Sequence, residues 1–201
     1  MSLAFVQGRV TDDVYQLMLD WVKSYPCEYI IKRERKSRLG DFSFHPTKGN
    51  VITVNENLNQ YSFLVTLTHE IAHLIAFTEH GRSIQPHGKE WKTIFGGLLR
   101  QLVRLNAFPK DLSVAVLKHA VKPKASSHSD SVLRRALMQY DDREDEYQLL
   151  EDLEVGERFT LKGGKSYEIL EKRRSRFLCV QLDNSRKYLV NKLAEIEPNK
   201  G

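Results

Sequence analysis

The chain has 201 residues, a formal net charge of +5 and 41% hydrophobic residues, a length that suits one ordinary domain and a small second one. No run of about 20 apolar residues predicts a membrane span, and the N-terminus lacks the basic and apolar regions of a secretory signal. The two cysteines, Cys27 and Cys179, argue against a disulfide framework, exclude a cysteine-rich zinc ribbon and favour a reducing, cytoplasmic compartment.

The first half of the chain predicts helices around a few strands. A first helix starts after Thr11, whose hydroxyl can cap it, and closes before Pro26. Alternating and short apolar runs then predict a β-hairpin or a three-stranded antiparallel meander. The strands are expected near 29–31, 39–44 and 51–54. Further helices are expected over 61–78, from 87 to before 109, and over 112–120.

The residue composition and pattern change in the second half of the chain. Residues 122–130 are polar and contain a proline, which indicates a linker, and 132–150 predicts a helix that becomes acidic. Tight-turn residues then separate short β-rich runs at 158–161, 167–170, 177–182 and 187–190. The predicted class is α+β, with a first domain at 1–120, a linker and acidic helix at 121–152 and a small, basic, barrel-like β module at 153–201.

The most informative stretch is THEIAH, which lies within the apolar helix predicted over 61–78. His69 and His73 stand at positions i and i+4, so both rings project from one face and can share a metal ion. Glu70 lies one step round the helix, where it can reach a water bound to that metal. This is the HExxH pattern of zinc hydrolases, in which three protein ligands leave a fourth position open. Zinc is therefore the predicted cofactor and Glu70 the predicted catalytic base.

Spacing leaves the third ligand open. The candidates that follow the motif are Glu79, His80, His87 and Glu90. His87 is preferred because it stands after a loop, at the start of the next predicted helix, where the chain can turn back to the metal. The remaining histidines have no such context and are interpreted as surface or structural residues: His45, His119 and His128.

HEIAHLIAF followed by GRSIQPHGKEWK resembles the SprT-like family of zinc metalloproteases, and the upstream segment SRLGDFSFHPTKGNVITVNENLNQYSFLVTLTHE is similar to that family too. The resemblance covers about residues 14–105. It implies a compact zincin-like fold, protein substrates that in the best-known relatives are bound to DNA, zinc ligation by His69, His73 and His87, and Glu70 as the catalytic residue. Many members carry a C-terminal zinc ribbon, and the β-rich module stands in its place here.

Two basic clusters suggest a surface for single-stranded or damaged DNA. One lies ahead of the motif helix, and the other lies in the C-terminal module, where residues 156–192 hold ten Lys and Arg against four Asp and Glu. Tyr167, Phe177 and Tyr188 are interleaved there and could stack on bases, or they could fill the core of the module. The candidate contact residues are Arg33, Arg35, Lys36, Arg38, Lys172, Arg173, Arg174 and Arg176.

The leading hypothesis is a zinc-dependent endopeptidase that hydrolyses peptide bonds with a metal-activated water. One alternative is a nucleic-acid or protein-binding module with a structural zinc site, and another is a zinc hydrolase of small amides. Glu70 counts against a structural site, which has no use for a base beside its ligands. Arg82 and Tyr61 are candidates for stabilising the oxyanion.

Overall fold

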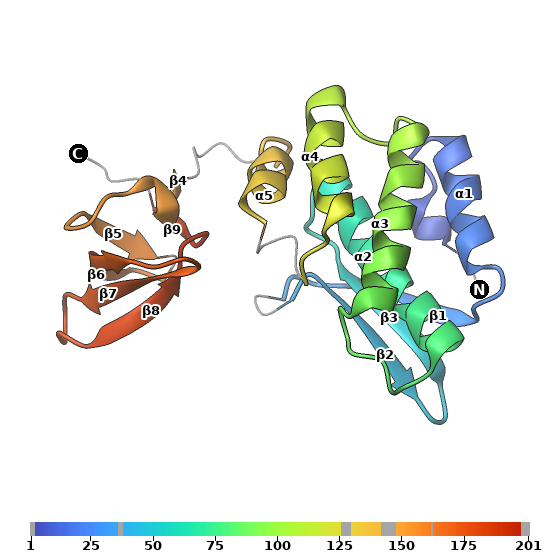
Figure 1. The fold of residues 1–201 in the computed structure, drawn as a ribbon, viewed down its shortest axis with the longest axis horizontal. Helices are drawn as coiled ribbons and strands as arrows, with labels where there is room; N and C mark the ends of the chain where they lie inside the picture. Colours follow the sequence, from blue (N-terminus) through green and yellow to red (C-terminus); the bar gives the residue numbers. More distant parts are fainter. Residues whose placement is uncertain (1–2, 36–37, 126–129, 142–147, 162, 198–201) are drawn as a thin grey trace. The chain divides into compact units, whose positions relative to one another are not determined.

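The computed structural model describes residues 3–35, 38–125, 130–141, 148–161 and 163–197 (Figure 1). Contacts between residues divide the chain into two compact units, Met1–Asp142 and Arg143–Gly201. The boundary between the units lies within the predicted linker segment 121–152, and the domain limits at 120 and 152 stay predictions. Within the described ranges, no helix combines the length and the hydropathy that crossing a membrane requires.

The first unit contains most of the helices and a small sheet. Its elements are η1 (Ala4–Val6), α1 (Asp12–Val22), β1 (Cys27–Lys32), β2 (Gly40–His45), β3 (Gly49–Asn55), α2 (Gln60–His80), α3 (Lys89–Arg104), α4 (Lys110–Val121) and α5 (Ser131–Met138). The α+β class is confirmed, as is the hairpin of β2 and β3, which pairs Phe42 with Ile52.

The third strand of this sheet is not part of an antiparallel meander. The strand order is β1-β3-β2, and β1 runs parallel to β3. β1 ends and β2 begins at the same end of the sheet, since Lys32 pairs with Asn55 and Gly40 with Val54 of β3. β2 itself carries the chain back along the sheet before β3, which makes β1 and β3 parallel and leaves β1 and β2 as the two edge strands.

Helix α2 is buried along most of its length because it packs against β2 and β3 as well as against α3 (Figure 1). The Asn59 side chain caps its start by accepting hydrogen bonds from the N–H groups of Tyr61 and Ser62. The buried residues of α2 include Phe63, Leu67, Ile71 and Leu74, which form part of one continuous core. A helix held on several sides is a rigid support for a site.

The second unit is an antiparallel sheet with the order β4-β9-β5-β6-β7-β8. Its elements are β4 (Gln148–Leu149), η3 (Leu150–Asp152), β5 (Arg158–Leu161), β6 (Lys165–Lys172), β7 (Arg176–Gln181), β8 (Lys187–Asn191) and β9 (Glu195–Glu197). Among the described strands the sheet does not close into a barrel. Its two edge strands do not pair, and the two-residue β4 offers too short a ladder to close against β8.

The long helix expected over 132–150 is wrong. Helix α5 ends at Met138 and β4 already begins at Gln148, while 142–147 lie outside the described residues. Leu133 and Leu137 belong to the core of the first unit, whereas Leu150 belongs to the core of the second. The apolar positions at the two ends of this span therefore serve two different cores.

Candidate metal centre

Three histidines converge in the first unit. His69 and His73 project from successive turns of α2, and their Nε2 atoms lie 3.1 Å apart. The Nε2 atom of His87, which precedes α3, lies 3.0 Å from that of His73 and 3.2 Å from that of His69. These three residues form a group that could hold a metal ion. Of the candidates for a third ligand, the structure brings His87 to the other two, whereas Glu79 accepts a hydrogen bond from the Tyr25 hydroxyl.

His87 reaches this position through an unusual backbone conformation. Its φ angle is 62°, in the left-handed region that residues other than glycine seldom adopt. The turn around it is held by the N–H of Gly88, which donates to the carbonyl of Gln85 at 2.8 Å. Such a conformation costs about 1 kcal/mol or more and persists where the surroundings impose it. Here it turns the imidazole ring back toward α2.

The donor set fits a metal ion such as zinc. Three nitrogen atoms bound to zinc at about 2.0–2.1 Å in tetrahedral geometry lie roughly 3.3 Å from one another, close to the separations seen here. Burial, together with the neighbouring histidines, lowers the pKa of His69 to about 2, and burial and His87 lower that of His73 to about 4. Burial also lowers the pKa of His87. The rings are therefore neutral at physiological pH, the form that binds metals.

Trp91 of α3 forms a wall behind all three imidazoles. Its ring centroid lies 4.6 Å from that of His69, 5.2 Å from that of His73 and 4.7 Å from that of His87. The side chain is fully buried, and its Nε1 donates to the backbone carbonyl of His69 at 3.4 Å. Sequence reasoning assigned Trp91 no role at the site, although the residue stands within the family-like segment GRSIQPHGKEWK.

Glu70 is a buried carboxyl group at the edge of this cluster, only 7% exposed. Burial raises its pKa to about 8, and the negative charge of Asp41 adds to the shift, while the Phe42 N–H and the cations Arg35 and Arg38 oppose it. A carboxyl group in such surroundings can hold a proton near neutral pH. That is a property of groups that accept and return a proton during a reaction.

Strand β2 passes directly over Glu70, and a glycine permits this approach. A Cβ atom at Gly40 would lie 2.7 Å from the Glu70 Oε1 atom and 2.8 Å from Cγ2 of Thr66. Any side chain at residue 40 would therefore displace the carboxylate or the strand.

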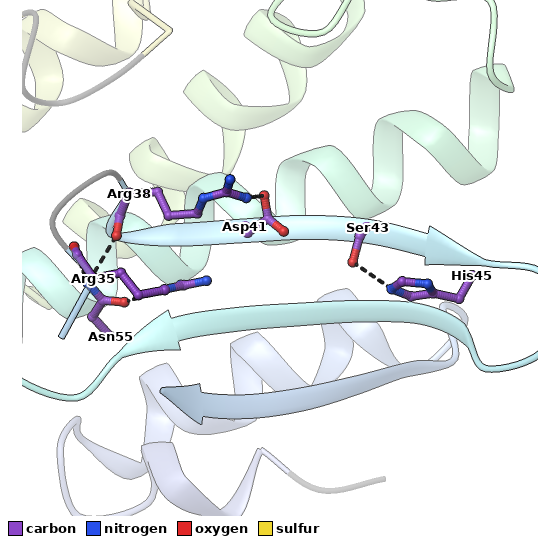
Figure 2. Close-up of polar contacts among 6 residues, drawn as sticks. All are labelled: Arg35, Arg38, Asp41, Ser43, His45 and Asn55. Carbon is purple, nitrogen blue, oxygen red and sulfur yellow. Dashed lines mark hydrogen bonds and ion pairs between the residues drawn. The ribbon is translucent and has the colours of Figure 1, made fainter. Parts of the chain in front are cut away.

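Asn55, at the end of β3, anchors the loop that leads into β2 (Figure 2). Its Oδ1 accepts from Nε of Arg35 at 2.8 Å, and its Nδ2 donates to the backbone carbonyls of Arg35 at 3.2 Å and Arg38 at 3.0 Å. The residue is 1% exposed. Figure 2 also shows the ion pair between Arg38 and Asp41, with 2.7 Å between Nη1 and Oδ1. Sequence reasoning missed Asn55, because its partners lie 17 to 20 residues away.

The three histidines line a cavity of about 430 Å³. One wall is the edge strand β2, through Gly40, Asp41 and Phe42, and another comes from α2 and the loop after it, through Phe77 and Arg82. Of the two candidates for oxyanion stabilisation, Arg82 therefore lines the cavity, whereas Tyr61 packs against Phe108 and Tyr140. The arrangement offers a metal site, a carboxyl group and open space for a substrate.

The predicted nucleic-acid residues are divided between the two units. In the first unit Arg33 is exposed, Arg35 and Arg38 are engaged as described, and Lys36 lies outside the described residues. In the second unit Lys172 Nζ lies 2.8 Å from a Glu154 oxygen, and Arg173 pairs with Glu171 at 2.9 Å. Of the predicted cations of the second unit, Arg174 and Arg176 are exposed and form no ion pair with any described residue.

Two of the three aromatics that could stack on bases or fill the core lie in the core of the second unit. Tyr167 is 7% and Phe177 4% exposed, whereas Tyr188 is 38% exposed. Strand alternation explains this, since Phe177 and Tyr167 point to the face that packs against the core. The basic excess over 156–192 is also partly balanced by acids outside that range, because Lys192 pairs with Glu151.

Comparisons with known proteins cover the segment of the chain that holds these histidines. Residues 14–110 match the SprT-like family. Protein SprT of Pseudomonas savastanoi pv. phaseolicola is 39% identical over 83 residues, which cover 36% of this chain and 51% of that protein. Protein SprT of Salmonella arizonae is 28% identical over 117 residues, which cover 52% of this chain and 70% of that protein.

The chain thus spans about half the length of the first of these relatives. No solved structure matches the chain. The matched segment contains β1 to β3, α2 and α3, and with them all three converging histidines and Glu70. Over residues 14–110 the chain therefore resembles the SprT-like family.

Proposed function

We propose that the protein is a zinc-dependent endopeptidase. The observation that carries this proposal is the triangle of three Nε2 atoms, 3.0–3.2 Å apart, beside a buried carboxyl group in an open cavity. Three nitrogen ligands and an accessible fourth position are the pattern of catalytic zinc sites, whereas structural sites are closed by four protein ligands. This contrast argues against the alternative of a binding module with a purely structural metal.

A zinc ion held by His69, His73 and His87 would lower the pKa of a water molecule and polarise the carbonyl group of a bound peptide. Glu70 accepts the proton of the attacking water on its carboxylate and returns it to the leaving amine. The wall formed by Trp91 restricts the imidazole rings, and burial of the carboxyl group strengthens its interactions with nearby charges.

The edge strand supports a peptide rather than a small amide as the substrate. β2 is at the edge of its sheet and lines the cavity through residues 40–42. The outer side of an edge strand carries backbone N–H and C=O groups that can pair with an extended chain. A peptide bound in this way would run past Glu70, whose carboxyl group lies against Gly40 of this strand.

We further propose that the substrates include proteins bound to DNA and that the protein works in the reducing cytoplasm. Exposed cations such as Arg33 and Arg174 support contact with phosphates, and the two cysteines, both free and buried, support a reducing compartment. The buried aromatics of the second unit favour backbone contacts over base stacking.

The test is a cleavage assay with the zinc-loaded full chain, a DNA-binding protein as substrate, and single-stranded DNA present or absent. Glu70→Gln is the control, since it keeps the size of the side chain and removes its basicity. Cleavage that needs zinc and is lost in the variant, at equal zinc content, is the expected result. Bound zinc without cleavage of any protein would overturn the peptidase proposal. Cleavage that DNA does not stimulate would overturn only the link to DNA.

A further inference from the structure

Arg82 stands at the cavity because α2 ends just before it. Gly81 follows the last residue of the helix with a φ angle of 79°, a conformation that glycine adopts without strain. Its N–H donates to the Phe77 carbonyl at 2.9 Å. The chain thereby turns out of the helix axis, and the next residue, Arg82, lines the cavity that holds the histidines.

Two aromatic rings hold the guanidinium group of Arg82. Its Cζ lies 4.4 Å from the ring centroid of Phe44 on β2 and 5.9 Å from that of Phe77 on α2. Those rings also contact each other, with centroids 5.4 Å apart. A guanidinium stacked on a ring keeps its N–H groups free at its edge, where they can donate to a carboxylate in a fork.

The charge of Arg82 has no counter-charge among the residues that the structure describes. Asp41, which lines the same cavity, pairs with Arg38 at 2.7 Å. Glu79, three residues before Arg82, accepts from the Tyr25 hydroxyl instead. A cation that lines a cavity, is oriented by two rings and lacks an acidic partner is suited to bind an anionic group of a ligand.

The position of Phe77 indicates how far the Arg82 guanidinium lies from the histidines. Phe77 lies four residues after His73 on the same face of α2, which corresponds to about 6 Å along the helix axis. An extended peptide advances about 3.3 Å per residue, so the same distance spans about two residues of substrate.

We propose that Arg82 binds a side-chain carboxylate of the substrate and so selects peptide segments with Asp or Glu within about two residues of the cleaved bond. This inference rests on the proposed peptidase function and names a substrate class for it. Arg82 acts here as a specificity-determining residue. A free C-terminus would offer the same chemistry, so the test compares amidated peptides with free ones.

The experiment uses the zinc-loaded full chain and internally quenched decapeptides in which one position at a time carries Glu, Gln, Ala or Lys. Arg82→Ala and Arg82→Glu are compared with Arg104→Ala, which removes an exposed arginine at the end of α3, outside the cavity. The wild type is expected to cleave the Glu peptide about three- to tenfold faster than the Gln peptide at one position near the bond. Arg82→Ala should abolish this preference, Arg82→Glu should favour Lys there, and Arg104→Ala should change neither.

A second measurement separates this inference from the peptidase proposal. Fluorescein-labelled Glu and Gln peptides are titrated into zinc-loaded Glu70→Gln protein, with and without Arg82→Ala, and the Kd values are read from anisotropy. Cleavage without a Glu preference, or a preference that survives Arg82→Ala, overturns the role of Arg82 and leaves the peptidase standing. Glu-selective binding through Arg82 without cleavage in the wild type supports the role of Arg82 and overturns the peptidase. A preference confined to peptides with a free C-terminus overturns the side-chain assignment.

Discussion

Gly40 lies against Glu70 so closely that a methyl group at residue 40 would come within 2.7 Å of the Oε1 atom. Contacts this short are not tolerated, so Gly40→Ala must move the strand or the carboxylate. A displacement of about 1 Å at a reacting group can lower a rate roughly 100-fold. We therefore expect cleavage by Gly40→Ala to fall about 100-fold while zinc content stays at one ion per chain.

The matched control for this substitution is Gly97→Ala on α3. A Cβ atom at Gly97 meets no atom within 4 Å, so this variant should keep full activity and gain about 0.5–1 kcal/mol of stability from its higher helix propensity. Cleavage rates and metal content are measured on both variants. Full activity of Gly40→Ala would show that the position of the Glu70 carboxylate does not depend on this contact.

Asn55 should be one of the most costly polar residues to remove from the first unit. Asn55→Ala deletes three hydrogen bonds in a site that is 1% exposed, and it leaves Arg35 without its acceptor. We expect a loss of about 2–4 kcal/mol in the free energy of unfolding, measured in urea. Asn50→Ala, which removes a single exposed hydrogen bond to the Pro26 carbonyl, should cost about 1 kcal/mol or less. Equal costs would contradict the anchoring role.

The pair of His119 and Asp130 predicts a dependence of stability on pH. Nδ1 of His119 lies 2.8 Å from Oδ2 of Asp130, which also caps the start of α5. Partial burial works to raise the pKa of Asp130, but the hydrogen bonds from His119 and from the Leu133 N–H outweigh it and place the pKa below its usual value.

The sign of the pH effect follows from that lowered pKa. Folding favours the ionised carboxylate, so its contribution is complete above the unfolded pKa of about 3.9 and is lost as the pH falls through the folded pKa. The variant Asp130→Asn keeps a capping side chain but cannot ionise. The stability difference between wild type and Asp130→Asn should be constant from pH 7 to 5 and shrink below about pH 4. A difference that is the same at pH 3 and pH 7 would exclude this linkage.

How much of the site could be predicted from the sequence depends on how far apart along the chain its contacting residues lie. His69 and His73 are one helical turn apart, so their shared face follows from helix geometry alone. His87 needed either the family resemblance or the structure, because its approach depends on a left-handed φ angle in a loop. The roles of Gly40 and Asn55 could not be predicted from the sequence, because the residues that they contact come close only in the tertiary structure.

The same reasoning explains what the sequence could not indicate elsewhere in the chain. Charge counts over 156–192 omitted Glu151 and Glu154, which lie before that range but pair with Lys192 and Lys172. The alternation of strand residues could have indicated that Tyr167 and Phe177 share the core face, but only with the register of the sheet known. The sequence did not indicate that β1 pairs in parallel, because the residues of a short strand do not show the direction of the strand beside it.

Trp91 should report directly on metal binding. All three imidazole rings lie within 5.2 Å of its ring, centroid to centroid, so a dication among them changes the electric field at the indole. The chain has two tryptophans. The other, Trp21, donates from Nε1 to Oε1 of Gln101 at 3.0 Å and makes no ring contact with a described histidine. In Trp21→Phe, removing the metal with a chelator and restoring zinc should change the emission of Trp91 reversibly.

The matched variant is Trp91→Phe, in which Trp21 alone emits and zinc should leave the emission nearly unchanged. The same titration should raise the stability of Trp21→Phe, by about 2.7 kcal/mol at a free zinc concentration 100 times the Kd, seen as a higher Tm. His87→Ala should lower the affinity for zinc and abolish both responses at that concentration, because two nitrogen ligands remain. Stoichiometric zinc binding that leaves the emission of Trp91 unchanged would place the metal elsewhere in the chain.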